Sequence, residues 1–151
     1  MPQRLPPEAR LLGLDVGTKT IGLALSDVTR SVATPYDTLR RTKFTADAKE
    51  LAAIVAKEGV GALVIGLPIN LDGSEGPRAQ STRAFARNLA AHVEVPMTFW
   101  DERLSTAAVE RHLIEADASR KRRAEVIDRM AAAYILQGAL DRLKRLAEDQ
   151  R

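Results

Sequence analysis

Apolar and polar residues follow two different patterns along this chain. Short apolar runs bounded by glycine, proline or polar residues predict strands, and longer stretches with apolar residues at helical spacing predict helices. The predicted strands cover residues 11–16, 21–27, 31–39, 61–67 and 95–101, and the predicted helices cover 44–58, 78–92, 104–116 and 124–146.

The connections between these elements predict how they pair. The turn at 17–20 is short, so the first two strands form an antiparallel hairpin. Pro35 places the third strand near a sheet edge, and the run 61–67 is apolar without alternation, as in a strand covered by helices on both faces. The order therefore predicts an α/β fold with a five-stranded mixed sheet flanked by helices.

Length and composition predict a single domain. The chain has 151 residues, about the size of one domain. Residues 1–9, with three prolines, are expected to form a flexible tail, residues 10–147 the domain, and 148–151 a second tail. The absence of cysteine excludes disulfides, thiolate zinc sites and cysteine nucleophiles. The sequence has no signal peptide pattern and no apolar run of membrane-spanning length, so a cytoplasmic protein is expected.

The most informative feature of the charged residues is the high share of arginine among the basic ones. The net charge is only +3, but 17 of the 23 basic residues are arginine. Arginine binds phosphate through a bidentate fork, which favours a nucleic-acid partner. The base composition of an organism's DNA can produce the same excess of arginine. Charge alone therefore does not decide whether the chain binds nucleic acid.

Acidic residues stand at the ends of three predicted elements. Asp15 closes the first strand, Asp101 and Glu102 close the last one, and Asp128 lies near the start of the final helix. Converging carboxylates repel one another unless a cation lies between them, and Mg²⁺ or Mn²⁺ suits a site made of oxygen ligands. Each acid alone has a plainer explanation, as a turn cap or as a favourable charge at a helix start. Together, on one side of a sheet, they indicate a metal site.

Candidate substrate-binding residues flank these acids. A turn with glycine, hydroxyl groups and lysine can hold a phosphate, and loops after buried strands are common ligand sites in α/β proteins. An ordinary hairpin turn, a plain connection and solvated arginines are the alternatives. The candidates are Gly17, Thr18 and Lys19 in the turn, Asn70 in the loop 68–77, Arg83 and Arg87 after it, and Arg103 after the acid pair. Residues 119–123 form a basic segment predicted to be a connector.

Four motifs resemble the YqgF/RuvX family. They are Leu14-Asp15-Val16-Gly17-Thr18-Lys19-Thr20-Ile21-Gly22, Gly66-Leu67-Pro68-Ile69-Asn70-Leu71-Asp72-Gly73-Ser74, Asp101-Glu102-Arg103-Leu104-Ser105-Thr106 and Ile127-Asp128-Arg129-Met130-Ala131-Ala132. The third motif adds Ser105 and Thr106 to the substrate-binding candidates.

This resemblance implies an RNase H-like fold and a nuclease that matures the 5′ end of pre-16S rRNA, with Holliday junction resolution as the alternative. It assigns the acidic triad to Asp15, Glu102 (or Asp101) and Asp128. RuvC-type enzymes carry their second acid at the end of the strand after the first helix, where this chain has Gly66-Leu67-Pro68. The hypothesis is two-metal hydrolysis, in which Asp15 bridges two Mg²⁺ or Mn²⁺ ions, and Glu102 and Asp128 each hold one.

Two other function classes compete with this hypothesis. The motif Asp-x-Gly-Thr also opens the actin, Hsp70 and sugar-kinase ATPases, but those proteins close a cleft between two such domains and this chain has one. The chain could also be a non-catalytic assembly factor that binds rRNA. The sequence leaves open whether the nucleic acid is RNA or branched DNA, and whether the protein is a monomer or a homodimer.

Overall fold

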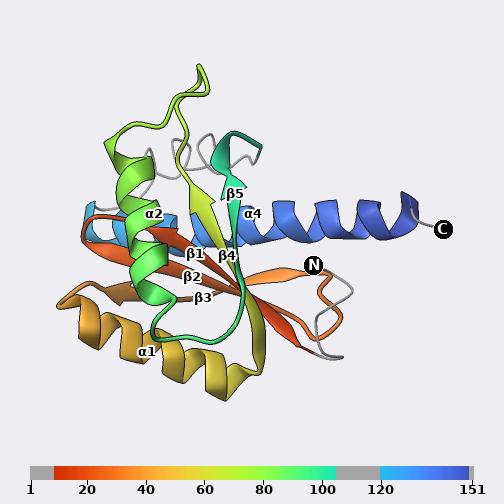
Figure 1. Cartoon of the computed structure of the whole chain (residues 1–151), viewed down its shortest axis with the longest axis horizontal. Helices are drawn as coiled ribbons and strands as arrows, with labels where there is room; N and C mark the ends of the chain where they lie inside the picture. The colour runs from red at the N-terminus through yellow and green to blue at the C-terminus, as the bar shows by residue number, and fades with distance from the viewer. Residues whose placement is uncertain (1–8, 105–119, 150–151) are drawn as a thin grey trace.

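The computed structural model describes residues 9–104 and 120–149, with the side chains of 104, 120–129 and 149 left outside that description. A five-stranded mixed sheet forms its centre, with strands in the order β3-β2-β1-β4-β5 (Figure 1). The elements in chain order are β1 (Arg10–Val16), β2 (Thr20–Ser26), β3 (Ala33–Arg40), α1 (Phe44–Glu58), β4 (Val60–Leu67), α2 (Pro77–Leu89), β5 (Met97–Asp101), the short 3₁₀ turn η2 (Glu102–Leu104) and α4 (Arg120–Asp149).

The predicted hairpin, the mixed sheet and the edge position of the third strand are confirmed. β1 and β2 form an antiparallel hairpin, β2 pairs antiparallel with β3, and β1–β4 and β4–β5 are parallel. β3, which contains Pro35, lies at the edge of the sheet, where a missing backbone N–H is tolerated. The carboxyl ends of β1, β4 and β5 therefore meet at one end of the sheet.

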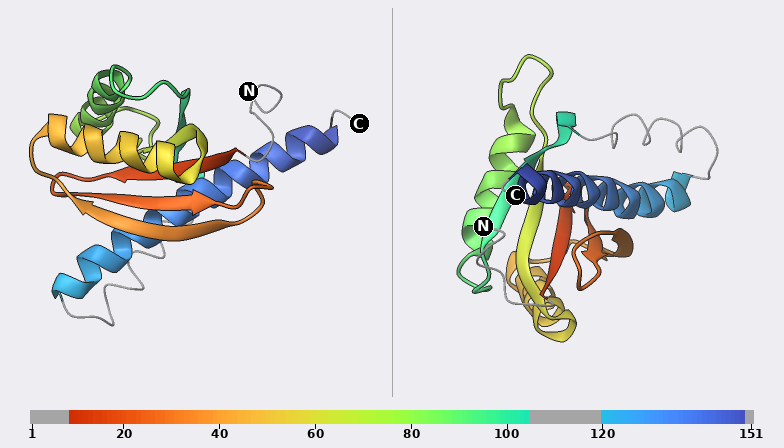
Figure 2. Two further views of the ribbon diagram at one scale, coloured as in Figure 1. Left: turned by 90° about the horizontal axis from the view of Figure 1, so that it is seen from below. Right: turned by 90° about the vertical axis from the view of Figure 1, so that its right-hand side faces the viewer.

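Helices cover both faces of this sheet. α1 and α2 lie on one face and the long helix α4 crosses the other (Figure 2). The core accordingly has two parts, one between the sheet and α1 and α2, the other between the sheet and α4. α1 ends at Gly59, which adopts the left-handed conformation (φ 65°) that favours glycine. No helix in residues 9–104 and 120–149 has the length and apolar character needed to cross a bilayer.

The prediction for the basic segment was wrong in one respect. Arg120, Lys121, Arg122 and Arg123 belong to the backbone of α4, which begins at Arg120 and ends at Asp149, whereas the sequence predicted a connector there and a helix over 124–146. Basic residues with good helix propensity extend a helix as readily as they form a connector, so the pattern of charges did not mark the boundary. The helix predicted at 104–116 falls largely on residues outside the described ranges.

Glycine lets α4 pack close to the sheet. A Cβ atom at Gly13 of β1 would lie 2.8 Å from the Cβ of Leu136 and 3.1 Å from the carbonyl oxygen of Ala132. Both atoms belong to the framework of α4 rather than to the flexible end of a side chain. The seam of α4 against the sheet is therefore made of small and aliphatic buried residues, Ala131, Ala132, Ile135, Leu136, Ala139 and Leu140.

Replacing Gly13 by Ala is expected to lower the free energy of unfolding by about 1–3 kcal/mol, because the new methyl group overpacks this seam. Urea denaturation followed by circular dichroism measures the change. Gly76→Ala is the matched control, since a Cβ there would meet only the side chain of Asn70, at 3.4 Å. An unchanged midpoint for Gly13→Ala would contradict the close packing of α4.

A second prediction concerns the turn between β2 and β3. The carboxylate of Asp27 accepts hydrogen bonds from the hydroxyl of Thr29 (2.7 Å) and from the N–H groups of Ser31 (2.8 Å) and Val32 (3.2 Å). These bonds, the Thr29 hydroxyl first, lower the pKa of Asp27 from 3.8 to about 2.

Because the folded state lowers this pKa, the carboxylate stabilises the fold fully above the unfolded value of 3.8 and progressively less as the pH falls towards 2. The free energy of unfolding of Asp27→Asn is therefore expected to fall less steeply than that of the unmodified chain over this pH window. Carboxyl chemical shifts measured by NMR as a function of pH check the cause. A titration of Asp27 near its ordinary value would contradict the prediction.

Candidate active site

The carboxyl ends of the parallel strands bring the predicted acids to one end of the sheet. In the register of β1 and β4, Leu14 lies beside Ile65, so Asp15 follows at the level of Gly66. In the register of β4 and β5, Gly66 lies beside Trp100 and Leu67 beside Asp101. Asp15 and the segment that ends β5 are thus separated by the width of a single strand, β4.

Asp15 lies on the face of the sheet that α4 covers. Side chains alternate between the two faces of a strand, and Leu11 and Gly13 both contact the α4 side. Asp15 is the next residue in that alternation, and its exposed fraction is 5%. A buried carboxylate at the end of a strand indicates a site with compensating charge or hydrogen bonds.

Glu102 lies on the same face. A Cβ atom at Gly66 would contact Ile135 of α4 and would lie 3.3 Å from the Cγ of Glu102. The side chain of Glu102 therefore runs over Gly66 on the α4 side, and Gly66 is the β4 residue at the level of Asp15. The absence of a side chain at position 66 leaves room for Glu102 between β4 and α4.

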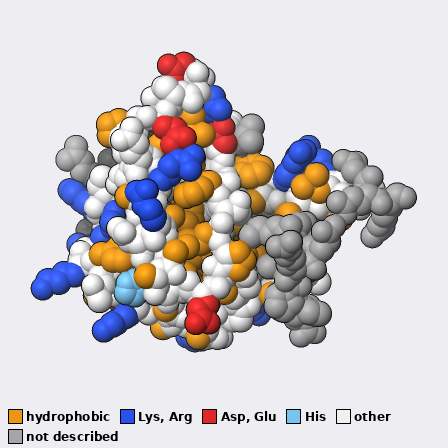
Figure 3. Space-filling view, viewed as in Figure 1, with side chains coloured by type: hydrophobic (Ala, Val, Ile, Leu, Met, Phe, Trp, Pro, Cys, Tyr) orange, Lys and Arg blue, Asp and Glu red, His pale blue; other side chains and the backbone are white. Residues whose placement is uncertain are grey.

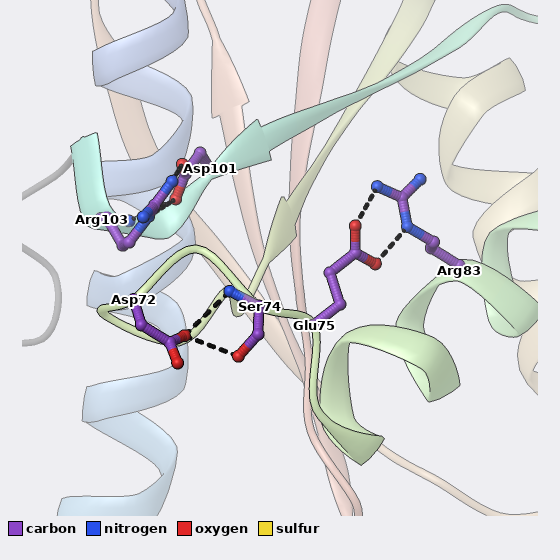
Figure 4. A network of polar contacts seen from close by, with 6 residues as sticks. All are labelled: Asp72, Ser74, Glu75, Arg83, Asp101 and Arg103. Atoms are coloured by element: carbon purple, nitrogen blue, oxygen red, sulfur yellow. Dashed lines mark hydrogen bonds and ion pairs between the residues drawn. The ribbon is translucent and has the colours of Figure 1, made fainter.

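Asp101, unlike Glu102, is paired with an arginine and lies on the opposite face of the sheet. Its carboxylate accepts hydrogen bonds from Arg103, at 2.7 Å from Nη2, at 3.0 and 3.1 Å from Nε and at 2.9 Å from the backbone N–H (Figure 4). The Arg103 guanidinium lowers the pKa of Asp101. Alternation along β5 puts Trp100 on the α4 side, against Gly138, and Asp101 on the opposite one. The sequence could not choose between Asp101 and Glu102, and the structure places Glu102, not Asp101, on the face that holds Asp15.

The third predicted acid, Asp128, is in α4, but its side chain lies outside the description. Ala131 and Ala132, one helical turn further on, are both buried against the sheet. Helical spacing therefore keeps Asp128 as a candidate for the same site, and its role stays a prediction. Among the described residues, no three His, Cys, Asp or Glu side chains form a group that could hold a metal ion. Ser105 and Thr106 also fall outside the described ranges.

The turn between β1 and β2 is closed by its own backbone. The N–H of Gly17 donates to the carbonyl of Thr20 at 2.8 Å, so this N–H closes the turn in this structure, and the predicted role of Gly17 in binding phosphate stays a prediction. Thr18 and Lys19 are exposed and stay candidates for binding phosphate. They follow Asp15 by three and four residues, at the end of the sheet where the acids lie.

The loop after β4 holds its shape through short polar contacts. The carboxylate of Asp72 accepts hydrogen bonds from the hydroxyl (2.6 Å) and the N–H (2.9 Å) of Ser74 (Figure 4), and these bonds lower the pKa of Asp72. The Nδ2 of Asn70 donates to the Ser74 hydroxyl at 3.0 Å. Gly73 has a φ of 90°, a conformation that favours glycine. Asn70, predicted to bind substrate, therefore organises the loop in this structure.

Two of the predicted arginines are paired with carboxylates. Arg83 donates two hydrogen bonds to Glu75, at 2.6 and 2.8 Å (Figure 4), and this pairing lowers the pKa of Glu75. Arg103 is paired with Asp101 as described above. Arg87 lies exposed in the last turn of α2. The ion pairs at Arg83 and Arg103 make them less available to a phosphate than the sequence suggested.

Two arginines that the sequence analysis did not select have different partners. Arg41 donates to the carbonyl oxygen of Gly17 at 2.6 Å, and Arg78 donates to the carbonyl oxygen of Val16 at 3.3 Å. Within the described part of the chain, neither forms an ion pair with a carboxylate. They come from the segment after β3 and the first turn of α2, and no motif in the sequence marked them.

A family model and several curated proteins match this chain over most of its length. The family model described as "RuvX: Holliday junction resolvase" matches residues 9–142. A protein of Paramagnetospirillum magneticum named "Putative pre-16S rRNA nuclease" is 68% identical over 137 residues, covering 91% of this chain and 88% of the relative. A protein of Methylocella silvestris with the same name is 61% identical over 149 residues, covering 99% and 92%.

A solved structure supports the fold independently. RuvC of T. thermophilus, in complex with a Holliday junction substrate, matches with a TM-score of 0.57 and 12% sequence identity, over 87% of this chain and 93% of RuvC. At that identity the match concerns the fold. It confirms the predicted RNase H-like architecture.

Proposed function

The chain belongs to the RuvX family, and on this premise we propose that it is a metal-dependent nuclease that processes the 5′ end of pre-16S rRNA. The observation that carries the proposal is the pair of carboxylates, Asp15 and Glu102, on one face of the sheet at the carboxyl ends of its parallel strands. The names of the relatives supply the substrate.

The donor set suits a hard divalent cation. Asp15 and Glu102 offer carboxylate oxygens, the ligands that Mg²⁺ and Mn²⁺ prefer, and Asp128 is proposed as the third. A bound cation of this kind supplies an activated water and stabilises the leaving oxygen of the phosphodiester.

Other residues of the protein are proposed to set the charge of the site and to bind the phosphates of the substrate. The burial of Asp15 keeps its charge in a poorly solvated place, where it acts strongly on a cation or a phosphate. The exposed Thr18 and Lys19 are proposed to position the phosphate that is cut. Arg87, Ser105 and Thr106 are proposed to contact flanking phosphates, and the arginines of the segment 120–123 are proposed to do so as well. We also propose that the protein is cytoplasmic.

Resolution of Holliday junctions is the second candidate, because the matching family model carries that description. Symmetric cleavage of a four-way junction needs two active sites, hence a dimer. A non-catalytic assembly factor is the third.

Incubation of the purified protein with Mg²⁺ or Mn²⁺ tests all three candidates. The substrates are a pre-16S 5′-leader RNA and a four-way DNA junction, and Asp15→Asn serves as the control. The proposal predicts RNA cleavage that the variant lacks. Paired symmetric cuts in the junction would move resolution to first place. Binding without cleavage of either substrate would favour the assembly factor.

A further inference from the structure

A cavity of about 210 Å³ opens on the α1/α2 side of the sheet, at the end where the acids lie, between the turn that follows β1 and the start of α2. Val16, Gly17, Thr18, Arg41, Arg78 and Ser81 contribute to its walls. Two arginines and two residues that carry hydroxyl groups therefore line one small cavity. None of the described residues that line the cavity is acidic.

Arg41 is held in place before any ligand arrives. Its guanidinium donates to the carbonyl of Gly17 at 2.6 Å and lies 5.3 Å from the ring centroid of Phe85. Its backbone N–H donates to the carbonyl of Lys19 at 2.8 Å. A charged group fixed in this way loses little conformational entropy on binding an anion.

Arg78 completes the positive wall from α2. Each guanidinium has five N–H donors. Arg78 donates one hydrogen bond, to the carbonyl of Val16 at 3.3 Å, and Arg41 one to Gly17. Arg83, which is on the same helix as Arg78, is by contrast paired with Glu75 of the preceding loop. Arg41 and Arg78 thus keep both uncompensated charge and donors for an anion, within the part of the chain that the structure describes.

We propose that this cavity binds a backbone phosphate of the nucleic acid, a few nucleotides from the phosphate that is cut at Asp15 and Glu102. The Cα atoms of Thr18 and Asp15 are three residues apart and therefore lie within about 11 Å of each other, so the cavity is at the same end of the sheet as the acids. The cavity is smaller than the roughly 300–1,000 Å³ of pockets for small-molecule ligands, so it suits a phosphate group rather than a whole nucleotide. In Figure 3, basic side chains stand at the left of the face shown, the end where Figure 1 places the β1–β2 turn.

The test is the binding of a fluorescein-labelled, single-stranded 5′-leader RNA, measured by anisotropy in EDTA at several salt concentrations. Arg78→Gln and Arg41→Gln are each expected to weaken binding about tenfold, since a hydrogen-bonded charge is lost. Each is also expected to make the plot of log affinity against log salt shallower by about 0.7. Arg145→Gln, which removes an exposed arginine near the end of α4, should change neither. Arg41→Lys, which keeps the charge, should restore part of the affinity and checks that position 41 tolerates a change.

This inference rests on the proposed function, and the experiment separates the two. Cleavage that depends on Asp15, together with unchanged affinity and salt slope in both arginine variants, would overturn the phosphate site and leave the nuclease intact. Weak binding by both variants without any cleavage by the unmodified chain would support the phosphate site and count against the nuclease. If Arg78→Gln changed only the binding of inorganic phosphate, followed by NMR, the cavity would be a site for free phosphate and the proposal would be wrong.

Discussion

Asp15→Asn is expected to lower the rate of RNA cleavage by about 10³-fold or more while leaving the fold intact. Asparagine keeps the shape of the side chain but removes the charge, and a bound metal ion contributes several kcal/mol to such a reaction, each 1.36 kcal/mol being a factor of ten. Initial cleavage rates on the 5′-leader RNA with Mn²⁺ measure the loss.

The control for this variant is its stability. Asp15 is buried, so the free energy of unfolding is measured by urea denaturation without metal, to show that the variant folds. Metal should then raise the melting temperature of the unmodified chain and not that of Asp15→Asn, because only a bound ligand stabilises the native state. Cleavage at the original rate by a folded Asp15→Asn would remove this residue from the active site.

The second large effect separates two neighbouring acids. Glu102→Gln is expected to lower the cleavage rate about as strongly as Asp15→Asn, because Glu102 lies over Gly66 on the same face as Asp15. Asp101→Asn is its matched control, one residue away and of the same charge. Asp101→Asn is expected to lower the cleavage rate by less than about tenfold, since it breaks only a partly exposed ion pair with Arg103.

The ratio of the two cleavage rates, measured at saturating RNA, decides between the acids. A severe loss in Asp101→Asn together with normal cleavage by Glu102→Gln would reverse the assignment. It would mean that the ion pair between Asp101 and Arg103 opens when nucleic acid binds.

Much of the fold could be predicted because its pattern is local. The strand runs, the short turn at 17–20 and the glycine that ends α1 each depend on a few neighbouring residues. The start of α4 could not be predicted, since Arg120 to Arg123 are compatible with a helix or a connector until the rest of the chain packs.

The candidate site could be predicted in part, for a similar reason. Asp15 stands near the end of a clearly apolar strand, and its place at the carboxyl end of the sheet follows from that. The choice between Asp101 and Glu102 depends on where β5 ends, because a shift of one residue moves a side chain to the other face. The structure ends β5 at Asp101 and turns Glu102 into η2.

Tertiary contacts explain what the sequence could not show about the arginines. Arg83 and Arg103 looked available, yet each contacts a carboxylate. Arg41 and Arg78 are far apart in the chain, and only folding brings them to the same cavity. Charge in a sequence shows that a residue can bind an anion, and the partners supplied by the fold decide whether it is available to do so.

Binding of Mn²⁺ shows whether Asp15 and Glu102 together hold a divalent cation. Electron paramagnetic resonance of free Mn²⁺ measures the ions removed from solution by the unmodified chain and by the three acid variants. Asp15→Asn and Glu102→Gln are each expected to lose Mn²⁺ binding that Asp101→Asn retains. Equal Mn²⁺ binding by the unmodified chain and Asp15→Asn would contradict this expectation.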